Sequence, residues 1–235
     1  MSNERSNPDI FGVPGPVVFG PNPKGGDNLT WSSLREMENS QERIVALEAR
    51  LRSYLVDGLS NAAENAHPFS SAALVMIGIE AFGEILFRDG SKGEDASKQR
   101  FCDACSKIDQ KFGRQLPKTG AQAFARRWNV SKPKSMGEIV YTFFRNSIVH
   151  SFYGRGLYLT CEDTKDVQLT DEGIAMLNPD WLLKKYRCSS GKLLDKLVKE
   201  KNGGALRRNA LKYLEKLLKQ SDAEVDEASD AGCPT

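Results

Sequence analysis

The sequence predicts a mainly α-helical protein: an up-and-down helical bundle with one small β-hairpin and extra helices at its C-terminal end. Between residues 31 and 220, apolar residues recur at spacings of three and four, which is the period of a helix with one buried face. Capping residues, prolines and glycines separate these periodic stretches. Near residues 157–170 apolar and polar residues instead alternate, as they do in a strand.

Both ends of the chain lie outside this predicted helical domain of residues 31–220. Residues 1–30 hold five prolines interleaved with glycines, which predicts a flexible segment without regular elements. Residues 221–235 hold five acidic residues and no lysine or arginine, which predicts a disordered acidic tail. Four apolar residues of the first segment could still pack on the helical body or on a partner: Phe11, Val17, Val18 and Phe19.

The first helix is predicted from Ser33 to about Asn65. Ser33 and Glu36 have the spacing of a capping box, which marks the start of a helix. An apolar stripe along this helix predicts packing in the core, with contact between two copies of the chain as the alternative. The stripe comprises Ile44, Leu47, Leu51, Leu55 and Leu59.

A second, strongly apolar helix is predicted from Pro68 to Arg88, because proline suits the first turn of a helix. We expect it to be the central buried helix. Glu80 and Glu84 lie within it, one turn apart, and a buried carboxylate needs a partner. Two interpretations stay open: an arginine pairs with Glu80, or both acids lie on a solvated strip. His67, just before the helix, is expected in a surface loop.

Helical spacing resumes from Ser97 to Phe112 and includes one CxxC pair, Cys102 and Cys105. Two cysteines on a half-buried helix are expected rather than a zinc site, because the sequence has neither a second CxxC nor paired histidines. No metal or other cofactor is predicted. The five cysteines are few and scattered, which favours a cytoplasmic protein over a secreted disulfide framework. No membrane span or signal peptide is expected from the apolar runs.

The net charge of +2 conceals two basic zones. Residues 98–134 hold ten lysines and arginines against two acids, and residues 181–220 hold twelve against three. Such zones can attract a phosphate backbone, although ordinary solvated helix faces have the same composition. Both interpretations stay open.

A short helix is predicted over residues 121–128 and carries Arg126 and Arg127. Lys132 and Lys134 follow it, in a connection that leads to the next helix. Trp128 could stack on a nucleic-acid base, but a tryptophan in the core is the expected role.

The next helix is predicted to begin near Ser135 and to end where glycines follow, soon after position 150. Near its end lie Arg145, Asn146 and His150. Asn146 and His150 are one turn apart on nearly the same side, whereas Arg145 points about 140° away from His150. The arginine and the histidine can serve one site if the helix loosens or if a second copy of the chain supplies the missing group. The apolar face comprises Met136, Ile139, Val140, Phe143 and Ser147.

After this helix the period changes to two. Residues 157–161 are predicted as a strand that pairs with residues 167–170 in a hairpin. Basic helices follow over about residues 179–219, separated by glycines. The first begins at Asn178, and two further amphipathic stretches are predicted over 191–199 and 205–218.

Arg145, Asn146 and His150 resemble the motif of the HEPN superfamily, in which an arginine, a polar residue, a short spacer and a histidine follow one another. HEPN domains are helical and occur in RNases, toxins and nucleotide-linked defence proteins. The resemblance covers about residues 33–160 through helix pattern as well as motif. It implies a homodimer in which the motif residues of two protomers face each other and cleave RNA without a metal. The predicted hairpin departs from a minimal HEPN unit, which is helical throughout.

The chemistry of these side chains suits RNA cleavage, in which the ribose 2′-hydroxyl is the nucleophile. His150 can act as acid or base near neutral pH. Arg145 can hold the scissile phosphate, because its planar fork matches phosphate oxygens. Asn146 would orient either group. The expected products carry a 2′,3′-cyclic phosphate and a 5′-hydroxyl.

The resemblance also implies supporting roles outside the motif. Glu80 has a place that resembles the acidic position of the family's second helix, so its pairing with Arg145 would orient the arginine. In toxin relatives a partner enzyme modifies a tyrosine two residues after the histidine. Phe152 has that position here and Tyr153 follows it, so Tyr153 is kept only as a supporting residue. Four basic residues are expected to guide RNA toward the motif: Arg126, Arg127, Lys132 and Lys134.

Other functions stay open beside an endoribonuclease in a toxin or phage-defence setting. A catalytically silent HEPN-like dimer could bind a regulatory protein or a nucleotide through the same cleft. Passive nucleic-acid binding by the basic helices would survive loss of His150 and weaken steeply with salt. A cationic pair at the exposed end of a helix would also satisfy the pattern, because cations suit that end of the dipole.

Overall fold

The computed structural model describes residues 18–88, 95–142, 156–162 and 166–230, with side chains as far as residue 219. Within these ranges the protein is mainly helical, as predicted. The chain divides into two compact units: Met1–Ser53 together with Leu197–Thr235, and Tyr54–Lys196. The predicted domain of residues 31–220 therefore includes parts of both units, and each unit has its own buried apolar residues.

The first unit begins with a small β-hairpin, where the sequence predicted no regular element. β1 (Val18–Gly20) pairs antiparallel with β2 (Leu29–Thr30). Phe19 of β1 is fully buried, and its ring centroid lies 5.0 Å from that of Trp31 in an edge-on contact. The Arg50 guanidinium lies 4.9 Å from the Phe19 ring centroid, a cation–π distance. The expected packing of this segment on the body is thus confirmed at Phe19. Two other residues of that expectation lie outside the described residues: Phe11 and Val17.

The predicted first helix is divided, and its predicted capping box is wrong. Thr30, rather than Ser33, caps the start: the Thr30 hydroxyl oxygen accepts a hydrogen bond from the Ser33 backbone N–H at 3.1 Å. Asn39 forms a second cap by accepting from the Gln41 N–H at 2.8 Å. The apolar period resumes beyond Asn39 and conceals this break. The segments are α1 (Trp31–Glu36), α2 (Ser40–Leu51), the π-helical η1 (Arg52–Gly58) and α3 (Leu59–Glu64).

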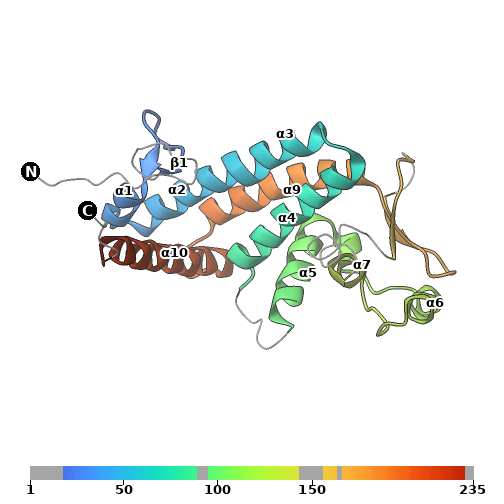
Figure 1. Cartoon of the computed structure of the whole chain (residues 1–235). Helices are drawn as coiled ribbons and strands as arrows, with labels where there is room; N and C mark the ends of the chain where they lie inside the picture. The colour runs from blue at the N-terminus through green and yellow to red at the C-terminus, as the bar shows by residue number, and fades with distance from the viewer. Residues whose placement is uncertain (1–17, 89–94, 143–155, 163–165, 231–235) are drawn as a thin grey trace, which may run out of the picture. The chain divides into compact units, whose positions relative to one another are not determined.

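In the first unit α2 packs against α10 (Ala205–Asp230), and the two helices lie side by side in Figure 1. α10 begins as predicted but extends to Asp230, so residues 221–230 are helical where we predicted a disordered tail. Alanine and glutamate, which favour helix, continue across that boundary. The apolar residues buried on these two helices include Ile44, Leu47, Leu51, Leu206, Ala210 and Leu214.

The second unit is built on α4 (Pro68–Leu86), which is the buried central helix that the sequence predicted. Both α3 and the helix that follows α4 pack against it. The remaining helices of this unit are α5 (Ala96–Ile108), the 3-10 helix η2 (Gln110–Phe112), α6 (Lys118–Trp128), α7 (Met136–Val140) and most of α9 (Pro179–Lys199).

Tyr186 of α9 ties three helical segments together. Its ring centroid lies 6.1 Å from that of Phe82 in α4, and its hydroxyl donates to the Leu55 carbonyl at 2.8 Å. Gly78 makes this approach possible, because a Cβ at that position would lie 2.3 Å from the Tyr186 hydroxyl oxygen. α9 runs through Gly191 without the break that we predicted there.

Among the described residues, one helix, α4, is long and apolar enough to cross a membrane by length and composition. We expected no such run from the sequence. In this structure 56% of the stretch is buried inside the protein. The core helix of a soluble protein meets the same criteria, so this finding is weak evidence for a membrane span.

The predicted hairpin exists, but with a different pair of strands. β4 (Val167–Leu169) pairs antiparallel with β5 (Ala175–Leu177), and β3 (Leu157–Leu159) pairs in parallel with the other edge of β5. The predicted pairing of the first two strands is therefore wrong. The turn gives the reason: Gly173, at φ +73°, donates its N–H to the Thr170 carbonyl at 3.0 Å. This tight turn joins β4 to the strand that follows it.

Candidate functional site

The predicted catalytic motif lies outside the described residues, whereas the helix that leads to it, α7, is described. Ser135 caps α7, because its hydroxyl oxygen accepts a hydrogen bond from the Glu138 N–H at 3.3 Å. The predicted start and apolar face are confirmed as far as Val140, since Met136, Ile139 and Val140 are buried. The predicted residues outside the described ranges are Arg145, Asn146, His150, Tyr153, Phe143 and Ser147.

α7 is packed against α5 from its first turn. A Cβ added at Gly137 would lie 3.5 Å from the Cys102 sulfur and 3.3 Å from the Phe112 carbonyl oxygen. The ring centroids of Tyr141 and Phe101 are 5.5 Å apart. The chain that enters the motif is therefore held on one side by α5 and the residues after it.

The four residues predicted to bind RNA are all exposed. Arg126 and Arg127 lie in the last turn of α6, and Lys132 and Lys134 lie in the connection to α7. Within the described ranges none of the four forms an ion pair with a carboxylate. The Arg127 guanidinium lies 6.0 Å from the Trp128 ring centroid. These side chains therefore keep their charge available to solvent.

The backbone beneath these cations is fixed. The Lys134 N–H donates to the Glu138 carboxylate at 3.0 Å, and the Lys134 carbonyl accepts from the Leu116 N–H at 3.1 Å. Ser135 forms an isolated antiparallel bridge with Gln115. The connection is thus tied to the segment before α6 and to α7 itself.

The β4–β5 turn packs against α6, the helix that carries two of these arginines. The Thr119 hydroxyl donates to the Asp171 carboxylate at 2.9 Å. A Cβ at Gly120 would lie 2.6 Å from the Thr170 carbonyl oxygen, so only glycine allows this contact. The small sheet, which the HEPN-like pattern does not include, therefore supports the basic helix.

Trp128 is half-buried at the end of α6. Its ring centroid lies 6.5 Å from that of Phe124, which is fully buried. This contact supports the core packing that we expected for Trp128. Stacking of a base on its remaining exposed surface stays a prediction.

The two glutamates of α4 have different surroundings. Glu84 is half-buried, and its Oε1 accepts from Arg100 of α5 through Nε at 2.8 Å and Nη2 at 2.7 Å. Glu80 is also half-buried, but its predicted partner, Arg145, lies outside the described residues, so that pairing stays a prediction. His67 is exposed, as predicted, and also caps α4: its Nδ1 accepts from the Phe69 N–H at 3.3 Å.

The CxxC pair lies on a partly buried helix face, as predicted. Burial raises the pKa of the Cys105 thiol well above its ordinary value. Burial, reinforced by the Glu138 carboxylate, raises the pKa of Cys102 to about 12. Both thiols are therefore protonated near neutral pH and lack the thiolate that attacks electrophiles. Within the described ranges, no three His, Cys, Asp or Glu side chains gather as a metal ion would require.

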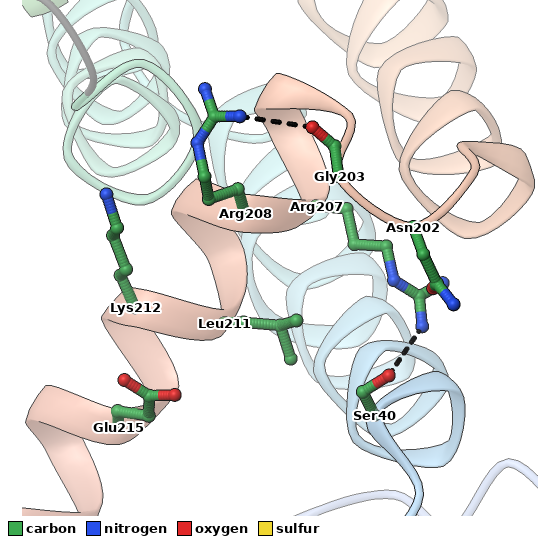
Figure 2. Close-up of a pocket in the computed structure, with 8 residues that line it drawn as sticks. All are labelled: Ser40, Asn202, Gly203, Arg207, Arg208, Leu211, Lys212 and Glu215. Atoms are coloured by element: carbon green, nitrogen blue, oxygen red, sulfur yellow. Dashed lines mark hydrogen bonds between the residues drawn. The ribbon is translucent and has the colours of Figure 1, made fainter.

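A pocket that the sequence did not predict lies in the first unit, where α10 begins beside the start of α2. Its volume is about 390 Å³. Figure 2 shows Arg208 and Lys212 on one side of α10, Ser40 and Asn202 on the other, and Leu211 between them. The residues that line it are Ser40, Asn202, Gly203, Arg207, Arg208, Leu211, Lys212 and Glu215.

Arg207 is the buried cation of this pocket, with 3% of its surface exposed. Its guanidinium donates to the Gln41 side-chain oxygen and to the Ser40 hydroxyl oxygen, the latter at 3.0 Å. Both acceptors are neutral. Among the side chains that the structure describes, no carboxylate lies within ion-pairing distance of this guanidinium. A sequence reading could not find this residue, because buried and exposed arginines look alike in a basic helix.

The start of α10 is capped by Glu200, the residue that follows the end of α9. The Glu200 carboxylate accepts from the Arg207 backbone N–H at 2.8 Å. Gly204 leaves room for it, because a Cβ there would lie 2.2 Å from the Glu200 carboxyl carbon. The glycines predicted to separate the C-terminal helices thus also leave room for a helix cap at Gly204.

The described residues define a mainly helical protein with a small mixed sheet and with cations in two different settings. Comparison with protein-family models, curated proteins and solved structures found no match for this chain. Its function therefore has to be inferred from its own residues.

Proposed function

We propose that this protein is a metal-independent endoribonuclease that acts as a homodimer. The observation that supports this most is the placement of the HEPN-like motif. In the sequence, Arg145, Asn146 and His150 come after α7, which ends at Val140 and whose cap and buried face agree with the helix predicted to lead to the motif. The exposed cations at the end of α6 and before α7 offer a phosphate backbone an approach to that helix.

The proposed reaction is attack of the ribose 2′-hydroxyl on the adjacent phosphorus. A base removes the hydroxyl proton, the P–O5′ bond breaks, and an acid returns a proton to the leaving oxygen. His150 supplies acid or base, Arg145 neutralises charge on the phosphate, and Asn146 orients one of them. The products carry a 2′,3′-cyclic phosphate and a 5′-hydroxyl.

A dimer follows from the number and direction of these groups. The chain has two histidines, and the other one, His67, caps α4. Base and acid therefore require His150 from each of two protomers. In a regular helix Arg145 also points about 140° away from His150 of its own chain, which favours a site completed by a second copy.

The test measures RNA cleavage in EDTA by the wild-type protein and by His150→Ala. General acid–base catalysis contributes about 10²- to 10⁴-fold, so a loss of that size is expected. His67→Ala is the matched control, because it removes the other histidine and is expected to keep cleavage. A substrate with 2′-deoxyribose at the cleaved position should resist the wild-type protein.

A mixing experiment tests the dimer. Wild-type protein and an excess of His150→Ala are combined under conditions that allow subunits to exchange, and cleavage is measured again. Because base and acid need His150 from each of two protomers, mixed dimers are expected to be inactive, so cleavage should fall below the share of wild-type chains in the mixture. Equal cleavage by wild type and His150→Ala would contradict the nuclease, and a stable dimer without any turnover would favour the silent scaffold.

A further inference from the structure

We infer that single-stranded RNA binds along the exposed face of α6, through a row of side chains formed by Lys118, Gln122 and Arg126. The inference rests on the proposed function for the choice of RNA as the partner. The sequence predicted Arg126 for RNA binding, but neither Lys118 nor Gln122. The row therefore extends the predicted RNA path from the end of α6 to its beginning.

The members of this α6 row lie on one face of a regular helix. α6 is 11 residues long, and the row occupies its first, fifth and ninth positions. At about 100° per residue, this spacing places Lys118, Gln122 and Arg126 within about 80° of one another around the helix axis. Successive members are about 6 Å apart along the axis. All of them are exposed, so a strand that follows the axis can meet them in turn.

The other side of α6 is packed, which fixes the direction of the row. Gly120, Ala121 and Phe124 are buried. A Cβ at Gly173 would overlap the backbone nitrogen of Phe124, so the β4–β5 turn lies directly against the helix. α6 cannot rotate about its axis without breaking these contacts, and the row keeps facing solvent.

The row has donors that the described part of the protein does not use. Within the described ranges, the side chains of Lys118, Gln122 and Arg126 form neither an ion pair nor a hydrogen bond. The Asp171 carboxylate lies at the flank of the row, where it accepts from the Thr119 hydroxyl at 2.9 Å. Lysine, arginine and glutamine are among the residues that contact phosphate and sugar oxygens in nucleic acids.

Lys118 has a position that the stability of α6 does not explain. It is the first residue of the helix, and the first turn contains no acidic residue. The macrodipole favours an anion at this end and disfavours a cation. A phosphate bound by Lys118 would instead be attracted both by the ammonium group and by the positive end of the helix. The lysine therefore fits a role in binding better than a role in folding.

The dimensions of the row favour a single strand over a duplex. A helix of 11 residues is about 16 Å long. Recognition of double-stranded RNA uses contacts to two successive minor grooves over about 16 base pairs, which one helix of this length cannot span. Single strands are bound by a basic track that follows the backbone, and one row of donors provides such a track.

The experiment measures fluorescence anisotropy of a labelled oligouridylate with the full chain carrying His150→Ala, so that the RNA stays intact. Lys118→Gln should weaken binding and reduce the slope of log K against log salt by about 0.7, the loss of one phosphate contact. Gln122→Ala changes no charge. It should weaken binding about two- to tenfold, the size of one hydrogen bond, and leave the slope unchanged.

Matched controls remove the same groups elsewhere. Lys192→Gln on α9 and Asn61→Ala on α3 replace an exposed cation and an exposed amide, and both are expected to leave the affinity nearly unchanged. The inference is overturned if the two row variants bind as tightly as their parent, if the controls weaken binding as much, or if a duplex of RNA binds as tightly as the single strand.

The proposed nuclease is tested separately, by RNA cleavage with His150 intact. Loss of affinity in both row variants without any cleavage by the wild-type protein would contradict the nuclease and support the binding row. Cleavage by the wild-type protein together with unchanged affinity in Lys118→Gln and Gln122→Ala would overturn the binding row alone.

Discussion

Arginine side chains lie in two different environments in this protein: exposed at the end of α6 and buried at the start of α10. Arg126 and Arg127 are exposed and have no carboxylate partner within the described residues. Arg207 is 3% exposed and donates to two neutral oxygens. Water can hydrate the guanidinium groups of Arg126 and Arg127. The buried Arg207 guanidinium has lost that hydration, so neighbouring protein groups must stabilise its charge.

This difference has consequences for what each region can recognise. Exposed cations attract any polyanion, and salt screens them over a Debye length of about 8 Å at physiological ionic strength. A buried guanidinium is fixed in direction and is screened much less, so it can select an anion by shape. Under the proposed function, the exposed cations of residues 126–134 would attract RNA through their charge, whereas the Arg207 guanidinium is held in one direction by Gln41 and Ser40.

The largest expected effect comes from removing the buried cation. Arg207→Ala leaves the Gln41 and Ser40 oxygens without their donor and opens a cavity, which should lower the free energy of unfolding by about 2–4 kcal/mol. Urea denaturation measures this change. Arg127→Ala, at an exposed site, should stay within about 0.5 kcal/mol of the wild type.

Arg207→Met separates packing from charge. Methionine fills much of the volume without a buried charge, so its loss of stability should be smaller than that of alanine. If Arg207→Ala were as stable as Arg127→Ala, the guanidinium would not be part of a packed structure, and the contrast between the two regions would fail.

The second prediction concerns RNA affinity and its dependence on salt. Replacing all four exposed cations by glutamine should weaken binding to single-stranded RNA at least tenfold in 50 mM salt. Each phosphate contact that is lost should also reduce the slope of log K against log salt by about 0.7. Fluorescence anisotropy at several salt concentrations gives both quantities. The residues replaced are Arg126, Arg127, Lys132 and Lys134.

A matched change elsewhere shows whether position or net charge is responsible. Lys184, Lys192, Lys196 and Lys199 lie on α9, outside the predicted RNA path. Their replacement by glutamine removes the same number of charges. Equal losses of slope in the two variants would mean that RNA responds to net charge alone and would remove the guiding role of the segment 126–134.

The same contrast explains how much could be read from the sequence. The apolar period predicted α4, α5 and the beginning of α7, because each of these helices buries one continuous face. Local capping chemistry was harder: Asn39 interrupts the first helix without interrupting its apolar period. The hairpin was assigned to the wrong partner because strand pairing depends on the Thr170–Gly173 turn and on packing against α6, neither of which the alternating pattern contains.

The two candidate sites differ in the same way. The HEPN-like motif is a local pattern, so sequence suffices to suggest it, and the described part of α7 agrees with its context. The α10 pocket joins Ser40 to Arg207, which are far apart in the chain. No spacing rule links them. Arg207 reads as one of many basic residues until the fold shows that it is buried.

The smallest expected effect tests whether the contact between α5 and α7, next to the exposed cations Lys132 and Lys134, is tightly packed. Cys102 lies behind α7, and its pKa is raised to about 12 from an ordinary value of 9.0, first by burial and then by Glu138. The unfolded chain loses this proton as pH rises through 9, whereas the folded protein keeps it. Unfolding therefore releases a proton above pH 9, and stability falls as pH rises from 9 toward 12.

Between pH 8 and pH 10 this thiol should lower the free energy of unfolding by about 1 kcal/mol, since one pKa unit corresponds to about 1.4 kcal/mol. Cys105 acts in the same direction, because burial raises the pKa of its thiol as well. Cys102→Ala should reduce the pH-dependent loss by about 1 kcal/mol in urea denaturation at the two pH values. Cys188→Ala, at an exposed position, is the control and should leave the loss unchanged. If Cys102→Ala lost as much stability as the wild type, water would reach the space between α5 and α7. Lys132 and Lys134 would then not be held in place by a packed contact between α5 and α7, and they could attract RNA only through their charge.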